Sequence, residues 1–440
     1  MGLGARLGRF AKATRTKRVT VVAGAALLGM LVARNNRACP SGLDGGASAA
    51  PIAALIPAAT SAPEATRASA TADPSALEQQ QNPFGLVEPG SAPTSPPPAA
   101  RPAAPPPGPP KQENPYGVIQ PAASEAEAMT ETLQVQREKL FAHMQSELEL
   151  SEAQVSRVRQ LFGASSILSQ GNPRISLHPI GRAECREAIA QRPLRPGDSV
   201  CGAPHMAAVY DRSKSEPDSA GVCIDQFEFP NIPCEYPVVH VSAREAAQLC
   251  EAVGKRLCDA HEWEGACAGT LDTPEREYPW GNDRKAMRRI HNAARTKVWA
   301  YGPEKNHALC ATSSYKTPGC PGGGFNSCGS NTFPAGAFPD CVSPFGVYDL
   351  HGNAAEHMSL PVRRDELTSK GGSGQTEMKG SWFIFSHYEA HEDDCHWRAP
   401  DWHPSAVNSS HSHGNYHLGF RCCKSLDAGP TVASTTPASP

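Results

Sequence analysis

Hydrophobic residues recur at helical spacing between Ser124 and Phe162, among Glu, Gln, Arg and Lys side chains. The apolar positions of the first predicted helix are Leu133, Leu140, Met144 and Leu148. Ser151-Glu152-Ala153-Gln154 forms a capping box, which predicts the start of a second helix that ends at Gly163. We expect this pair, within residues 122–168, to pack on the following domain, with self-association as the alternative.

The pattern changes in residues 169–424, which are rich in Gly, Pro, Cys and aromatic residues. Capping boxes at Ser242 and Asp259 predict two helices, which end near Gly254 and Gly269. Short apolar runs predict strands at residues 222–224 and 237–241. Only short regular elements are expected here, so this domain should be loop-rich and stabilised by cross-links.

The N-terminus combines basic residues with an uncharged run from Val19 to Ala33, the order of an export signal. No small-residue cleavage site follows directly, so residues 1–37 are interpreted as an uncleaved signal anchor, with a cleaved signal peptide as the alternative. This anchor is expected to attach the protein to the cell membrane, which is therefore an expected partner. Because the basic cluster precedes the apolar run, the C-terminal domain should be extracytoplasmic, either periplasmic or at the cell surface. Cleavage would make the protein secreted.

Residues 38–121 are rich in Pro, Ala and Ser, which predicts a disordered tether, and residues 425–440 are predicted to form a disordered tail. The tether contains a repeat, NPFGLVEP at residues 82–89 and NPYGVIQP at residues 114–121. These two short apolar segments are either docking motifs for a partner or duplicated low-complexity sequence.

Charge and cysteine content narrow the function classes. The formal net charge is −3, which does not favour a nucleic-acid partner. Fourteen of the fifteen cysteines lie between Cys185 and Cys423, an even number that indicates disulfides in an oxidising compartment. Their spacings are irregular, which disfavours structural zinc, and the sequence does not determine the connectivity.

The stretch GVYDLHGNAAEHM, residues 346–358, places acids on both sides of a tight Leu350-His351-Gly352-Asn353 turn. Carboxylates and backbone carbonyls directed at one point suit a hard cation such as calcium. The alternative is a polar turn with two solvated acids.

Seven segments in this order resemble the formylglycine-generating enzyme, or sulfatase-modifying factor, family. They are CIDQFEFPN from Cys223, Val241-Ser242 with its helix, KRLCDAHEWE from Lys255, YPWG from Tyr278, GVYDLHGN from Gly346, KGSW from Lys379 and LGFRC from Leu418. The resemblance implies an α+β domain with little regular structure, distantly similar to C-type lectin-like folds.

The resemblance also implies structural calcium. One site would use Asp349, the carbonyls of Gly352 and Ala354, and Glu356. A second site would begin with the side chain of Asn292 and the carbonyl of Ala293, and its other ligands cannot be placed from the sequence.

Family members that oxidise a substrate cysteine to formylglycine have a copper-binding C-x4-C pair between the GSW and GFR motifs. Cys395 fits the first position here, but Pro400 stands at the second, so the usual pair is not intact. His396 and neighbouring imidazoles, His387 and His391, are candidate ligands for copper or iron in a replacement site around a catalytic Cys395. The alternative is that Cys395 is half of a disulfide.

Two function classes follow from this sequence. The first is a divergent metal-dependent oxidase that acts on a cysteine of a protein or peptide substrate, or on a small thiol. The second is a non-catalytic, calcium-stabilised module that binds a peptide or glycan at the cell envelope. Whether the protein is an enzyme depends on the surroundings of Cys395.

Overall fold

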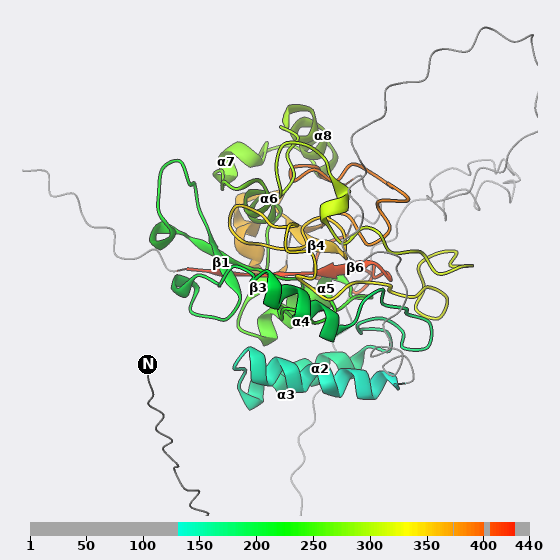
Figure 1. Cartoon of the computed structure of the whole chain (residues 1–440). Helices are drawn as coiled ribbons and strands as arrows, with labels where there is room; N and C mark the ends of the chain where they lie inside the picture. Colours follow the sequence, from blue (N-terminus) through cyan, green and yellow to red (C-terminus); the bar gives the residue numbers. More distant parts are fainter. Residues whose placement is uncertain (1–130, 373, 400–404, 427–440) are drawn as a thin grey trace, which may run out of the picture. The chain divides into compact units, whose positions relative to one another are not determined.

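Two small sheets organise the part of the chain that the structure, a computed structural model, describes: residues 131–372, 374–399 and 405–426. The larger sheet has the order β1-β2-β7-β3 and the smaller sheet has the order β5-β4-β6. Figure 1 labels β1 and β3 of the larger sheet and β4 and β6 of the smaller sheet. Strand pairs are antiparallel except β4 with β6, which is parallel. The strands are β1 Met206–Val209, β2 Val222–Asp225, β3 Arg256–Leu257, β4 Ala355–Leu360, β5 Gln375–Lys379, β6 Leu418–Phe420 and β7 Cys422–Ser425.

Helices and loops make up most of the remaining described residues. The α-helices are α2 Leu133–Glu147, α3 Glu152–Ala164, α4 Arg182–Gln191, α5 Ala243–Ala252, α6 Ala260–Ala268, α7 Pro274–Glu277 and α8 Arg284–Ala294. The 3-10 helices are η4 Ser199–Cys201, η5 Pro217–Ser219, η6 His307–Leu309 and η7 Arg364–Gly372. This mixed, loop-rich architecture agrees with the α+β class expected from the sequence.

The predicted helical pair is α2 and α3, and its apolar faces are buried in one core cluster with α5. Met144, Val158 and Phe162 are almost fully buried there, together with Leu249 of α5. The capping box at Ser151 is formed as predicted. The pair therefore packs on the following domain, while the exact domain boundaries drawn from composition stay predictions.

Disulfides connect segments that are distant in the sequence. Every cysteine in the described residues is paired, in seven disulfides, so the expected disulfide framework is present. The pairs are Cys185–Cys234, Cys201–Cys223, Cys250–Cys422, Cys258–Cys423, Cys267–Cys395, Cys310–Cys341 and Cys320–Cys328.

The strand predicted at residues 237–241 is wrong. Val239 forms only an isolated bridge with Ser169, and His240 has a φ of 54°, which interrupts an extended conformation. Val238 donates instead to the carbonyl of Phe229. The segment is buried through tertiary contacts, so its apolar run reflected burial and not strand pairing.

The predicted anchor, tether and tail lie outside the described residues. Within the ranges that the structure describes, no helix is both long and apolar enough to cross a membrane.

Candidate functional site

Cys395, the predicted catalytic cysteine, is buried and bonded to Cys267 of α6. The Nε2 atom of His351 lies 3.4 Å from Cys267 Sγ and 4.0 Å from Cys395 Sγ. A disulfide sulfur is not a thiolate, so Cys395 could hold Cu(I) only after reduction of this bond. The residues of this site in their disulfide state therefore do not fit a copper ion. Pro400 lies outside the described residues.

His396 does not join His387 and His391 in one cluster. Its side chain is partly buried, which lowers the pKa of the imidazole, and its carbonyl accepts a hydrogen bond of 2.8 Å from His291 Nε2. The ring of His391 instead stacks on Trp397 at a centroid distance of 4.3 Å. Among the described residues, the groups with metal-ligand spacing place His396 with Glu264, Glu277 and His291, separately from Cys395.

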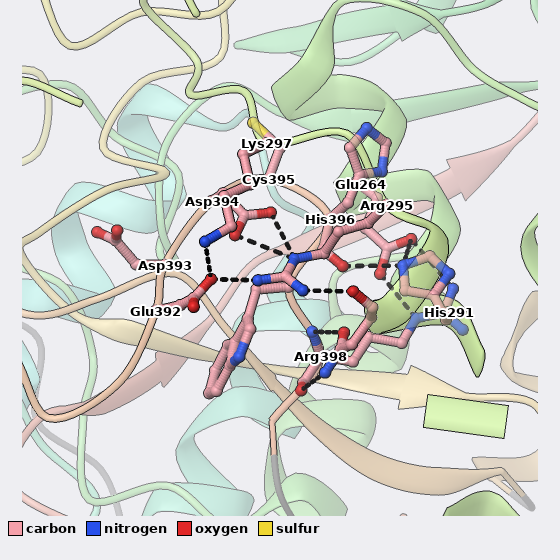
Figure 2. Close-up of polar contacts among 12 residues, drawn as sticks. Glu264, His291, Arg295, Lys297, Glu392, Asp393, Asp394, Cys395, His396 and Arg398 are labelled. Atoms are coloured by element: carbon pink, nitrogen blue, oxygen red, sulfur yellow. Dashed lines mark hydrogen bonds and ion pairs between the residues drawn. The ribbon is translucent and has the colours of Figure 1, made fainter. Parts of the chain in front are cut away.

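Glu264 of α6 is the centre of the polar network around His396 (Figure 2). Its carboxylate accepts from Lys379 Nζ at 2.9 Å and from Arg398 Nε and Nη2 at 2.9 and 3.0 Å. Burial, together with the nearby Glu264 charge, raises the pKa of Glu277 to about 8, and burial lowers the pKa of His291 to about 4. Two cations already pair with the Glu264 carboxylate, so these residues support the loop without requiring a metal ion.

The predicted calcium loop presents an acid in an unusual backbone conformation. Asp349 is buried with a φ of 58°, its Oδ2 accepts from the Gly336 amide at 2.6 Å, and its Oδ1 has no hydrogen-bond partner in the described residues. Glu356 is engaged elsewhere: Arg421 donates to its two oxygens at 2.6 and 2.7 Å, and Trp263 Nε1 donates at 3.0 Å. Asp349 thus suits a cation, whereas Glu356 would have to leave Arg421.

A third buried carboxylate, that of Glu228, is hydrogen-bonded to this loop. It accepts from the side chain of Asn353 at 2.6 Å and from the amide of Ala354 at 2.8 Å. Burial and the neighbouring acids raise its pKa well above the usual range, and burial raises the pKa of Asp349 to about 7. The loop holds more carboxylates than the single guanidinium of Arg421 can neutralise, which leaves room for a proton or a cation beside Asp349.

The second predicted calcium site is built differently. Asn292 and Ala293 lie in the last turn of α8, and the Asn292 amide exchanges two hydrogen bonds with the backbone of Arg398, of 2.9 and 3.0 Å. The Asn292 carbonyl accepts from Arg295 Nη1 at 2.5 Å. Asn292 therefore fastens α8 to the loop around His396 in this structure.

Sequence reasoning did not find a cavity of this domain that brings several separate segments together. It has a volume of about 1070 Å³ and lies between the loop 314–323, the residues after Ser381 and the segment that precedes β6. Trp382, Tyr388 and Tyr416 give it a mostly apolar wall, and Lys316 is its one charged side chain among the described lining residues. The KGSW motif was the available signal, because its Trp382 lines the cavity.

Three residues that line this cavity have a buried polar atom without a partner. Ser314 Oγ, Trp382 Nε1 and His417 Nδ1 have no hydrogen-bond partner in the described residues. Burial holds the pKa of His417 well below its usual range, so this imidazole is neutral, and it stacks on Trp382 at 4.1 Å. A ligand with its own donors and acceptors would satisfy these atoms once their side chains turn toward it.

Residues 175–426 match the family described as sulfatase-modifying factor enzyme 1-like domain. The chain belongs to this family. The resemblance seen in the sequence motifs is thereby confirmed, and the sulfatase-modifying factor domain includes the two sheets, the seven disulfides and the cavity.

Curated relatives carry both active and inactive names. The formylglycine-generating enzyme of Bos taurus is 28% identical over 197 residues, 43% of this chain and 44% of that protein. The inactive C-alpha-formylglycine-generating enzyme 2 of Mus musculus is 30% identical over 195 residues, 43% of this chain and 50% of that protein. The chain thus matches half or less of the length of these relatives. Among solved structures, CarF is 12% identical with a TM-score of 0.28, covering 53% of this chain and 97% of that chain.

Proposed function

We propose that this protein is a non-catalytic, peptide-binding member of the sulfatase-modifying factor family, held at the cell envelope by its N-terminal segment. The observation that carries the proposal is the cavity with buried, unpartnered polar atoms, among them Ser314 Oγ and His417 Nδ1. Its apolar wall suits side chains of a peptide, and these atoms suit main-chain groups. A glycan would need more polar partners than this wall offers.

The state of the cysteines supports binding over oxidation. Each cysteine of the described ranges is in a disulfide, so a copper thiolate pair would require prior reduction of Cys267–Cys395. The divergent oxidase of a protein cysteine or small thiol is the competing function. Two curated relatives, from Bos taurus and Mus musculus, are named inactive. Their names are consistent with a family member that lacks the reaction.

The binding proposal is tested with the full-length chain and a phage-displayed library of random dodecapeptides. Tyr388 lines the cavity and is 49% exposed, so Tyr388→Ala should leave the fold intact and weaken the selected peptides about tenfold. Ile290→Ala, at a 42% exposed position of α8, is the matched control and should bind as the parent does. Fluorescence anisotropy of labelled peptides measures both affinities.

Two results would refute this function. The first is a library without enriched peptides, or peptides that bind equally well to the Tyr388→Ala variant. The second is an aldehyde, detected by mass spectrometry, on a cysteine-containing peptide incubated with copper and the full-length protein. The expected result is binding without conversion.

We further propose that calcium stabilises the domain through Asp349 and the carbonyls of Gly352 and Ala354. A buried carboxylate oxygen without a partner destabilises a fold, and a bound cation would relieve that effect. Saturating calcium should raise the melting temperature by about 5 °C relative to EGTA. Asp349→Asn should abolish the shift, and Asp365→Asn, whose parent side chain is 76% exposed, should retain it. Equal melting temperatures in calcium and EGTA would exclude the site.

A further inference from the structure

We infer that the cavity binds a segment of this same chain, the NPYGVIQP repeat at residues 114–121. This inference rests on the proposed peptide-binding function and names the peptide. The repeat lies outside the described residues, and the argument uses its sequence, the chemistry of the cavity and the point at which the described chain begins.

The composition of the repeat matches the cavity. Residues 114–121 contain no charged side chain, and they include one aromatic ring and two aliphatic residues in a stretch otherwise dominated by Pro, Ala and Ser. The cavity wall is aromatic, with no carboxylate among its described residues. A neutral segment enters such a site without the desolvation of a charge, and its two prolines reduce the entropy lost on binding.

The polar groups of the repeat also match the unpartnered polar atoms of the cavity residues. The unpartnered Ser314 Oγ and His417 Nδ1 require a hydrogen-bonding ligand in an otherwise apolar pocket. A peptide segment supplies main-chain amides and carbonyls, and Asn114 adds a side-chain amide. The aromatic ring of Tyr116 has rings to pack against in Trp382 and Tyr388.

A series of contacts connects the first turn of α2 with the cavity wall. In the first turn of α2, Gln136 Nε2 donates to the Gly171 carbonyl at 3.2 Å. The next residue, Asn172, donates through Nδ2 to the Phe325 carbonyl at 2.9 Å. Phe325 is two residues from Gly323, which lines the cavity and accepts from the Tyr416 amide at 3.3 Å. Contacts therefore lead from α2 to the cavity wall.

The linker between repeat and domain is short enough to favour binding in cis. Nine residues separate Pro121 from Glu131, and they span at most about 30 Å when extended. Tethering over such a linker gives an effective concentration on the order of millimolar, which occupies even a weak site. The other copy, residues 82–89, has a much longer linker and a lower effective concentration, which is why we assign residues 114–121.

Photo-crosslinking of the full-length chain tests the contact directly. p-Benzoylphenylalanine in place of Tyr116 keeps an aromatic ring and should crosslink within one chain to residues 314–323, 382–388 or 415–417. The same probe at Ser95, a tether position outside both repeats, is the control and should show no preference for these residues. Crosslinks from position 116 that match the Ser95 pattern, or that join two chains, would overturn binding in cis.

A competition experiment separates this inference from the proposed function. A synthetic peptide of residues 112–123 should bind the full-length Pro115→Ala/Tyr116→Ala variant at least fivefold more tightly than the parent, because the internal competitor is removed. Adding Tyr388→Ala should abolish the gain. If library peptides bind the cavity but the 112–123 peptide does not, or binds parent and variant equally, the inference fails and the proposed function stands. If neither kind of peptide binds the Pro115→Ala/Tyr116→Ala variant, whose cavity has no internal competitor, both fail.

Discussion

Replacing Arg421 with Met is expected to lower the free energy of unfolding by about 4 kcal/mol. The guanidinium is fully buried and holds Glu356 through two hydrogen bonds of 2.6 and 2.7 Å. It also donates to the carbonyls of Tyr348, Asp225 and Gln226 at 3.0 to 3.2 Å. Its removal leaves Glu356 without a counter-charge in the interior. Losing one partner of a buried ion pair destabilises a fold more than replacing both partners with apolar residues.

Urea unfolding followed by circular dichroism at neutral pH measures the Arg421→Met effect. Arg192→Met is the matched control, because that side chain is 60% exposed and its partner Asp340 is 46% exposed, so their ion pair lies in solvent. The control should change stability by no more than about 0.5 kcal/mol. A loss below about 1 kcal/mol for Arg421→Met would show that the buried pair is not needed for the fold.

Glu277→Gln is expected to stabilise the protein at alkaline pH and to have little effect in acid. Burial and the adjacent Glu264 charge raise the pKa of Glu277 to about 8 in the folded protein, so the folded state keeps a proton that the unfolded chain releases near its ordinary pKa. The free energy of unfolding therefore falls as the pH rises from about 4.5 to about 8, and Glu277 causes no further loss above pH 8. Glutamine stays neutral and avoids this loss.

The Glu277→Gln gain should be near zero at pH 4.5 and on the order of 4 kcal/mol at pH 8, since each pKa unit corresponds to about 1.4 kcal/mol. Urea unfolding at both pH values measures it. Glu275→Gln on the same helix, where the parent side chain is 58% exposed, should show no comparable gain between the two. An equal Glu277→Gln effect at both pH values would contradict the raised pKa.

Local signals in the sequence located the helices and the family well. The capping boxes at Ser151 and Ser242 are formed, and at Asp259 the Glu262 carboxylate accepts from the Asp259 amide at 2.9 Å. These contacts could be predicted because they depend on residues only three positions apart. The motif order identified the family for the same reason, since each motif is short and contiguous. The strand expected near Val239 failed because burial came from distant residues and not from pairing.

Long-range contacts limited what could be predicted about the site. Glu356 was predicted as a calcium ligand from its neighbours, but its strongest partner, Arg421, is 65 residues away in the sequence. The C-x4-C copper motif relates Cys395 to a position only five residues later, whereas its sulfur is bonded to Cys267, 128 residues earlier. The cavity unites three separate segments, and no single stretch contains its pattern.

The order of strands has a consequence for biosynthesis. β7 is the last strand of the described residues, yet it lies between β2 and β3, and its cysteines are bonded to Cys250 and Cys258. The larger sheet cannot close until residues 422–425 have been synthesised. Until then β2 and β3 have unpaired edges and two thiols without partners. Folding of this domain is therefore completed only after that point, and a chain that stops before Cys422 should be cleared as misfolded protein.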